Sequence, residues 1–371
     1  MTTPPPTRRS HRPRSTTRAR RTSPAGAAVL AVALSALTAC GDNASAATLD
    51  LTAALPEKVP SGTELRLGDP VIQAILGASG LDKELSDAGV QPEWANLSGG
   101  PQTIQAFRGD KLDCGSVADI PSLFAAWTGT STKIVFQAVT IDPLEHPTYK
   151  LGVAPGVKVT SLADLRGKKI AYSAGQAQGA LVLRVLQKAG LTQKDVTLVE
   201  LTSTADSYVT ALGSKAVDVA PLGAANAKIY EGKYAGGSAI SPGIRDDAAT
   251  LYCLTKSVRD AGKAAALKVY VGVRAKALLW QNEHPAEYAK AYLEGVQGLS
   301  PEAAQGVLAV DGAKGIPASW DSAVARLQAT ADLLAAEQKH DKLDVNTLID
   351  RRFEPIEAAA AGPAVVTGDA A

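Results

Sequence analysis

Residues 171–180 read AYSAGQAQGA and are followed at once by the apolar run LVLRVL. The short run KKIAY (168–172) has the composition of a β-strand, and the residues from about Gln176 to Ala189 have the pattern of an amphipathic helix. Glycines bracket the polar turn between the two runs. Glycine lets the main chain approach a ligand closely, and the unsatisfied N–H groups in a helix's first turn attract anions. The stretch therefore predicts either a capped strand-to-helix turn or an anion site, and both interpretations stay open.

The glycine spacing excludes a nucleotide-binding loop, because three residues separate Gly175 from Gly179 and no lysine comes directly after them. Catalytic signatures are missing as well. There is no GxSxG motif, no cysteine with an evident base partner, and no metal-ligand spacing among His146, His284 and His340. The pair Asp246-Asp247 is expected to be a solvated turn. We therefore expect no enzyme activity, no cofactor and no metal.

The first 39 residues are expected to be an export signal. Seven arginines and no acid precede an apolar stretch, 25–38, that is too short for a mature membrane span. It ends in LTACG (37–41), which resembles the lipobox of bacterial lipoproteins, so Cys40 is the expected lipidation site. An ordinary secretory signal is the alternative. Arg8-Arg9 and Arg20-Arg21 lack the hydrophobic pair of a twin-arginine motif, which favours general secretion and leaves the other route open.

The composition describes a folded chain with no nucleic-acid character. Its 371 residues are 46% hydrophobic and 20% charged, enough for one large core or two ordinary ones. Without residues 1–39, 31 Lys and Arg stand against 37 Asp and Glu, a net charge of −6. Nucleic-acid binding therefore has no electrostatic support. Cys114 and Cys253 both lie in strand-like apolar runs; in an oxidising compartment they could pair, and two buried thiols would fit the same runs.

The rest of the chain alternates strand-like and helix-like runs, which is typical of doubly wound α/β sheets. Small and turn-forming residues predict a flexible tether over 40–61, with the fold beginning near Glu64. The segment YKLGVAPGVKV (149–159) interrupts the alternation and is expected to cross into a second unit. The expected domains are lobe 1 from 62–150 plus 250–356, lobe 2 from 151–249, and a disordered tail from 357–371. Two crossings form a hinge, so the carboxyl ends of both sheets should face one cleft.

Four stretches, in this order and spacing, resemble the solute-binding proteins of ABC importers for aliphatic sulfonates, taurine and nitrate, with thiamine-precursor binders as relatives. They are SGGPQTIQAFRGDKLDCGSVADIP (98–121), SLADLRGKKIAYSAGQAQGALVLRVLQKAGL (161–191), HPAEYAKAYLEG (284–295) and KLDVNTLIDRRF (342–353). The resemblance implies a two-lobe fold like that of the type II periplasmic binding proteins, with the helical C-terminal region packed on lobe 1. It also implies an extracytoplasmic, lipid-anchored receptor that closes on a small molecule and presents it to an ABC permease and ATPase. We expect a monomer.

In proteins of this kind the ligand groups come from the strand-to-helix loops. The resemblance implies ten ligand-binding residues: Asp69, Pro70, Gly99, Gln102, Ser116, Val117, Ser173, Gly175, Gln176 and Gln178. The chain departs from sulfonate binders in three places. Ala177 and Gln178 stand where a small hydroxyl residue is usual, DVAPLGAAN (218–226) has no aromatic ring, and GDP (68–70) replaces a Gly-aromatic-Gln pattern.

These departures keep the ligand open. An aliphatic sulfonate is the expected ligand, and nitrate, a thiamine precursor or another small organic solute are the alternatives. Two other classes of protein also stay open. One is an enzyme related to the thiamine-pyrimidine synthases, and the other is a surface sensor that signals through a partner.

Overall fold

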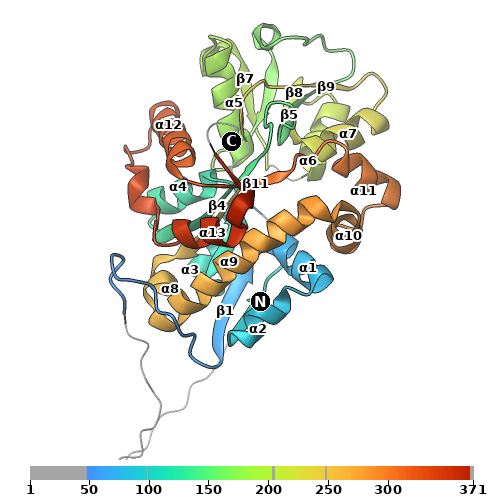
Figure 1. The fold of residues 1–371 in the computed structure, drawn as a ribbon. Helices are drawn as coiled ribbons and strands as arrows, with labels where there is room; N and C mark the ends of the chain where they lie inside the picture. The colour runs from blue at the N-terminus through green and yellow to red at the C-terminus, as the bar shows by residue number, and fades with distance from the viewer. Residues whose placement is uncertain (1–47, 98, 203–204, 247–248, 368–371) are drawn as a thin grey trace, which may run out of the picture. The chain divides into compact units, whose positions relative to one another are not determined.

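The computed structural model describes residues 48–97, 99–202, 205–246 and 249–367 (Figure 1). The chain divides into two units, Met1–Ala44 and Ser45–Ala371, and every described residue lies in the second. The expected export signal and Cys40 lie outside the described residues. Among the helices that are described, none combines the length and the apolar character needed to cross a membrane.

The second unit is a mixed α/β structure built on two sheets, as expected. The first sheet has seven strands, in the spatial order β12 (Val365–Val366), β11 (Lys314–Pro317), β4 (Thr132–Thr140), β10 (Ala249–Leu254), β3 (Cys114–Val117), β1 (Thr63–Gly68) and β2 (Val90–Trp94). The second has five, in the order β7 (Thr197–Glu200), β6 (Lys169–Tyr172), β8 (Val219–Gly223), β5 (Tyr149–Val153) and β9 (Ser238–Ile240).

Both sheets share one internal order. In the first, β2-β1-β3 are parallel, β10 is antiparallel to β3, and β4 is antiparallel to β10. In the second, β7-β6-β8 are parallel, and β5 runs antiparallel to both β8 and β9. The antiparallel strand in each sheet is the one that the chain enters directly after crossing between the sheets. Each sheet is therefore mixed. The strand that follows a crossing, β5 or β10, runs in the opposite direction to the parallel strands beside it.

The crossings are 141–148, between β4 and β5, and a stretch after β9 that is described over 241–246 and precedes β10. The segment expected to be the first crossing, 149–159, instead begins with strand β5. Val153 and Leu151 in this strand are buried, which explains why an apolar run marks it. The crossing proper is the polar stretch before it.

Helices cover the sheets and also join them. The helices are α1 (Pro70–Ser79), α2 (Asp82–Asp87), α3 (Gly100–Arg108), α4 (Ile120–Trp127), α5 (Ala177–Lys188), α6 (Ala205–Gly213), α7 (Ala224–Lys233), α8 (Thr255–Arg259), α9 (Ala261–Glu283), α10 (Pro285–Tyr288), α11 (Pro301–Leu308), α12 (Asp321–Gln338) and α13 (Glu354–Ala361). Four 3₁₀ turns among the described residues are η1 (Leu162–Leu165), η2 (Gln193–Asp195), η4 (Val345–Leu348) and η5 (Gly362–Ala364), and η3 (Ala289–Glu294) is a π-helix.

Figure 1 shows the long helix α9 crossing the first sheet, where it contacts β1, β11, α1 and α13. Helix α5 follows β6 of the second sheet. It packs against α4 and α12, which follow the first-sheet strands β3 and β11. One large hydrophobic core runs from first-sheet residues such as Leu67 through α5 residues such as Leu181. A smaller core around Leu212 and Tyr230 belongs to the second sheet alone.

The prediction for α5 is confirmed, and two other helical turns begin with side-chain caps. Helix α5 begins and ends within one residue of the expected bounds. Ser161 and Asp164 form a capping box at η1, because each side chain accepts a hydrogen bond from the backbone N–H of the other residue. Ser300 caps α11 by accepting a hydrogen bond from the Ala303 N–H at 3.2 Å.

Two terminal segments differ from their prediction. Within the expected tether, residues 48–53 are bonded to the folded body: the Leu49 N–H donates to the Arg259 carbonyl, and Arg352 donates to the Ala53 carbonyl. The tail expected to be disordered is ordered as far as Thr367. It completes α13, where Glu357 and Ala361 are buried, and adds β12 to the edge of the first sheet. Its alanine-rich composition suits a packed helix as well as a loose tail.

Cys114 and Cys253 form a disulfide between β3 and β10. The two residues face each other in the register of the antiparallel pair, and both are fully buried. Of the two possibilities left open by the sequence, pairing is the one that the structure shows.

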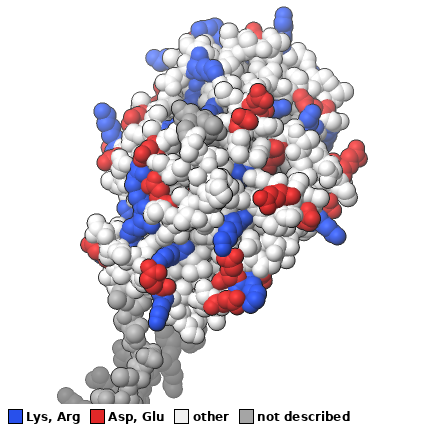
Figure 2. All heavy atoms as spheres, in the orientation of Figure 1, with Lys and Arg blue, Asp and Glu red and all other residues white. Residues whose placement is uncertain are grey.

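Figure 2 shows acidic and basic side chains interspersed over one face of the molecule.

Candidate ligand-binding site

The stretch AYSAGQAQGA forms the turn from β6 into α5. Gly175 has a φ of +78°, in the left-handed region that glycine adopts without strain. The Ser173 hydroxyl donates to Gln176 Oε1 at 3.0 Å, and the Gln176 N–H donates to the Ser173 carbonyl at 3.4 Å. Gln176 is the residue just before the helix. The turn is thus closed by its own side chains, as a capped strand-to-helix turn would be.

Gly179 has a packing role within the same turn. A Cβ atom at this position would overlap the carbonyl oxygen of Ser173, so no other residue fits without moving the helix away from the strand. Gln178, beside it, is the second residue of α5 and is half-buried. Its position in the first helical turn is the one where N–H groups lack partners inside the helix. The glycine therefore brings a helix N-terminus close to the end of a strand.

The loop between β1 and α1 contains a buried charge. Asp69 is fully buried, and its Oδ2 accepts from Arg274 Nε at 2.8 Å and from the Tyr270 hydroxyl at 3.0 Å. Burial, with the charge of Asp69 beside it, raises the pKa of Tyr270 well above its ordinary value. Pro70 is the first residue of α1 and has no N–H to offer a ligand.

Arg274, which the sequence analysis missed, joins two of the predicted loops. It lies on α9, is 2% exposed, and donates through Nη2 to the Ser116 hydroxyl at 3.0 Å, at the end of β3. Its guanidinium group stacks over Phe136 at 4.1 Å. Arg274 Nη1 and Asp69 Oδ1 are buried and have no hydrogen-bond partner among the described residues. The signal for this residue was a single arginine within the apolar run VYVGVRAKALLW (269–280).

The loops after β2 and β3 place the remaining predicted residues. Gly99 has a φ of +80° and precedes α3; its carbonyl accepts from the Thr103 N–H at 3.3 Å and from the Thr103 hydroxyl at 2.9 Å. Gln102 is exposed in the first turn of α3. The Val117 carbonyl accepts from the Thr250 hydroxyl at 3.2 Å. Threonine hydroxyls therefore hold a backbone carbonyl in each of these loops.

Loops from the two sheets meet at two points. A Cβ atom at Gly99, from the first sheet, would lie 4.0 Å from Gln176 Nε2, from the second. A Cβ atom at Gly175 would lie 3.2 Å from the ring of Phe124 on α4. The structure thus brings the turn before α3 to the turn before α5. It gives Asp69 and Ser116 a shared partner in Arg274, and none of the ten predicted residues lines the cavity described below.

A second buried ion pair joins α5 to the second crossing, and it corrects the expectation that Asp246 lies in a solvated turn. Arg184 on α5 pairs with Asp246 on the second crossing at 2.6 Å, with side chains 16% and 7% exposed. Asp246 is therefore not part of a solvated turn; Asp247 lies outside the described residues. Burial lowers the pKa of Arg184, but the charges of Asp246 and Asp119 outweigh it and raise the pKa. The pair links the helix of the candidate site to the hinge.

Sequence comparison agrees with the resemblance inferred above. A family model described as NMT1/THI5 like matches residues 123–271. Two relatives carry the name "Putative aliphatic sulfonates-binding protein". The one from Escherichia coli is 33% identical over 103 residues, which are 28% of this chain and 31% of the relative. The one from Bacillus subtilis is 24% identical over 266 residues, 71% of this chain and 78% of the relative.

Solved structures share the fold. The periplasmic aliphatic sulphonate binding protein SsuA from Escherichia coli superposes with a TM-score of 0.63 at 20% identity, covering 79% of this chain and 92% of that one. The desulfurization enzyme DszB also superposes, with a TM-score of 0.58 at 17% identity, covering 81% of this chain and all of that one. The chain has the fold of the periplasmic binding proteins, and the predicted fold class is confirmed. At these identities the likeness shows the fold alone, which binding proteins and an enzyme share.

Proposed function

We propose that this protein is the extracytoplasmic substrate-binding component of an ABC importer and captures a small organic anion between its two sheets. An aliphatic sulfonate is the first candidate, since both sequence relatives are named for that ligand. Nitrate, a thiamine precursor or another small solute is the alternative. The captured molecule would pass to a permease driven by an ATPase subunit, and the protein would act as a monomer held at the cell membrane by a lipid on Cys40.

The observation that carries the proposal is the meeting of Gly99 with Gln176. The two residues precede α3 and α5, so two helix N-termini from different sheets approach one another. Each N-terminus offers backbone N–H donors and the positive end of a helix dipole. Neutral donors of this kind suit a singly charged oxyanion, because they hold the charge without a competing counter-ion.

The chemistry of the described residues favours binding over catalysis. Cys114 and Cys253 are joined in a disulfide, so neither has a thiolate to act as nucleophile. Across the described ranges no group of three or more His, Cys, Asp and Glu residues could hold a metal ion. The ten predicted residues include two hydroxyls: that of Ser116 accepts from Arg274, and that of Ser173 donates to Gln176. Asp69, the one ionisable residue among them, is buried in an ion pair.

Calorimetry with a matched pair of variants tests the proposal. Gln178→Glu places a carboxylate in the first turn of α5, and Gln187→Glu makes the same change at the exposed far end of the same helix. Unit charges about 4 Å apart repel by roughly 1 kcal/mol in water and 4 kcal/mol near a protein surface. We therefore expect Gln178→Glu to weaken binding of an alkanesulfonate about tenfold or more, and Gln187→Glu to change it less than about twofold.

The ligand panel contains ethanesulfonate, butanesulfonate, taurine, nitrate and the thiamine pyrimidine. Saturable binding of one of these, with the ligand recovered unchanged, supports the proposal. Equal affinity in both variants would show that the anion does not sit at the N-terminus of α5. Conversion of the ligand to a new product would move the protein to the enzyme class.

A further inference from the structure

A cavity of about 570 Å³ lies at the hinge, away from the predicted ligand residues. The first crossing lines it with Asp142, Pro143, Leu144 and Glu145, and the second with Arg245. The first half of α12 closes the third side with Ser322, Ala325, Arg326 and Ala329. Its volume falls in the range of sites that hold organic molecules rather than bare ions.

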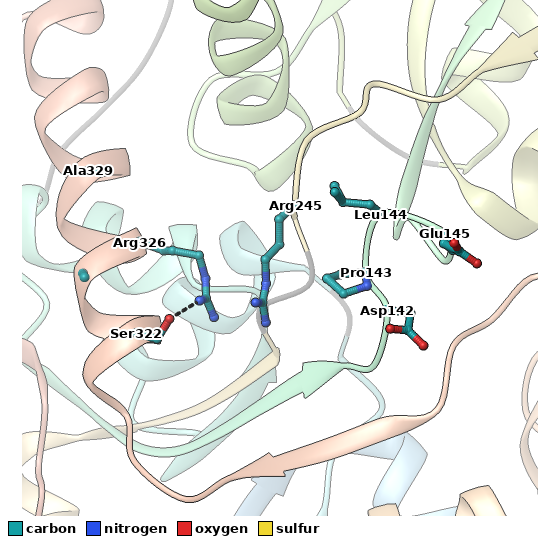
Figure 3. Close-up of a pocket in the computed structure, with 9 residues that line it drawn as sticks. Asp142, Pro143, Leu144, Glu145, Arg245, Ser322, Arg326 and Ala329 are labelled. Carbon is teal, nitrogen blue, oxygen red and sulfur yellow. Dashed lines mark hydrogen bonds between the residues drawn. The ribbon is translucent and has the colours of Figure 1, made fainter. Parts of the chain in front are cut away.

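Two arginines form the cationic side of this hinge cavity. Figure 3 shows the guanidinium groups of Arg245 and Arg326 extending side by side, one from the crossing and one from the helix. Arg326 Nη1 also donates to the Ser322 hydroxyl at 2.7 Å. A guanidinium keeps its charge at every physiological pH and presents a planar fork of donors that matches carboxylate, sulfonate or phosphate oxygens. Two such groups on one wall favour an oxyanion there.

Apolar groups form most of the remaining wall. Pro143 and Leu144 come from the crossing, while Ala325 and Ala329 lie one helical turn apart on α12. The Leu144 side chain is 57% exposed, one of the few large hydrophobic residues in that state among those described. Covering such a side chain is favourable, because it removes apolar surface from water. The ligand therefore needs a hydrocarbon body as well as a charged head.

The two carboxylates of the lining limit the ligand's charge. In Figure 3 the side chains of Asp142 and Glu145 lie on the opposite side of the cavity from the arginines and turn away from them. A second negative group that reached across the cavity would leave the arginines and approach these acids, and like charges repel. The arrangement therefore favours one negative charge at one end of the molecule.

We propose that the hinge cavity is a second ligand site, which binds a free organic monoanion with an apolar chain, such as a medium-chain carboxylate. Its occupant contacts both crossings and α12 at once, and it touches none of the residues proposed to hold the solute at α3 and α5. Because a ligand that binds only the folded state stabilises it by mass action, occupancy also raises the melting temperature.

Octanoate is the probe, with octan-1-ol as the neutral analogue and octanedioate as the dianion. Calorimetry and thermal unfolding on the full folded chain should show saturable octanoate binding, with the alcohol and the dianion at least about tenfold weaker. In Arg245→Gln/Arg326→Gln, octanoate affinity should fall about tenfold or more, since hydrogen bonds to charged groups contribute roughly 1.5–3 kcal/mol each. The matched control Arg108→Gln/Arg166→Gln removes two exposed arginines elsewhere and should bind octanoate as the parent does.

A second variant keeps both arginines and blocks the apolar side. Ala329 is exposed on α12, so Ala329→Phe should fold normally and fill the cavity, with loss of octanoate binding. Gln178→Glu should leave octanoate affinity unchanged, which separates this site from the proposed solute site. Unchanged binding in either hinge variant, equal affinity for octan-1-ol, or no binding at millimolar octanoate would each overturn the proposal.

Discussion

Buried charged residues tie distant parts of this molecule together. Arg274 is the centre of one group, where it pairs with Asp69 and lies within electrostatic reach of Glu357 on α13. Glu357 is fully buried, and its Oε2 accepts from the Gln137 N–H at 3.1 Å. Burial raises the pKa of Glu357 well above its ordinary value, and the hydrogen bond and the charge of Arg274 only partly oppose this. At this position the folded state therefore holds a proton that the unfolded chain releases.

That difference makes stability depend on pH in a defined direction. The ordinary pKa of the glutamate is 4.5, so below this pH the group is protonated in both states and its full contribution is present. As the pH rises above 4.5, the unfolded chain ionises first, and the free energy of unfolding falls by up to about 1.4 kcal/mol per pH unit until the folded pKa is reached. Glu357→Gln removes the titration. We expect this variant to gain stability relative to the parent as the pH rises, in urea unfolding at pH 4.5, 6 and 7.5.

The control for this prediction is Glu302→Gln, on the exposed surface of α11. Its stability difference from the parent should be small at all three pH values. If the difference for Glu357→Gln were also constant with pH, Glu357 would be ionised in the folded protein and its burial would be compensated by a charge partner.

At the scale of elements, the disulfide is the covalent link between β3 and β10. The two cysteines are 139 positions apart, and the intervening chain holds the whole second sheet. The strands are neighbours in the first sheet, so the bond fastens the place where the chain returns from the second sheet. A crosslink of this kind stabilises chiefly by restricting the unfolded chain, and its effect grows with loop length.

Removing this disulfide should lower stability by about 4–5 kcal/mol on the chain-entropy relation for a loop of this length. In Cys114→Ala/Cys253→Ala we expect the melting temperature to fall by roughly 5–10 °C, since a large domain loses only a degree or two per kcal/mol. The parent reduced under denaturing conditions serves as control and should unfold at the same urea concentration as the variant. Identical midpoints for oxidised and reduced parent would show that the bond constrains nothing that the fold does not already hold.

At the scale of the whole molecule, two sheets of the same strand order are joined by two crossings, and α5, α12 and α4 pack across the junction. This arrangement fits a receptor whose ligand loops come from both sheets. The proposed membrane anchor would determine where the whole molecule is located. A tether after Cys40 would place the binding unit at the outer surface of the membrane, near the permease that it serves.

The anchor predicts where the full chain is found. Expressed in a bacterium that processes lipoproteins, the parent should fractionate with the membrane, and Cys40→Ala should appear in the soluble extracytoplasmic fraction. The control Cys114→Ala/Cys253→Ala also removes cysteines but should stay in the membrane fraction. Mass spectrometry of the parent should find a diacylglyceryl group on an N-terminal Cys40. Membrane retention of Cys40→Ala would remove the lipid anchor from the proposal.

Several features of the fold could be predicted because they are local. The turn of Gly175, the start of α5, the capping box of Ser161 and the cap at Ser300 each depend on residues within four positions of one another. Short-range sterics and hydrogen bonds determine such features whatever the rest of the chain does. The alternation of strands and helices likewise follows from the spacing of apolar residues along the sequence.

The sequence by itself thus determined the alternation of strands and helices, the bounds of α5 and the polar turn before it. Only the tertiary structure decided which of these turns meet and which charges are buried. Asp69 and Arg274 are 205 positions apart, Arg184 and Asp246 are 62 apart, and the cysteines are 139 apart. Each of these pairs forms because strand order and helix packing make its members neighbours. No local pattern specifies that order, since it depends on how the whole chain buries its apolar surface.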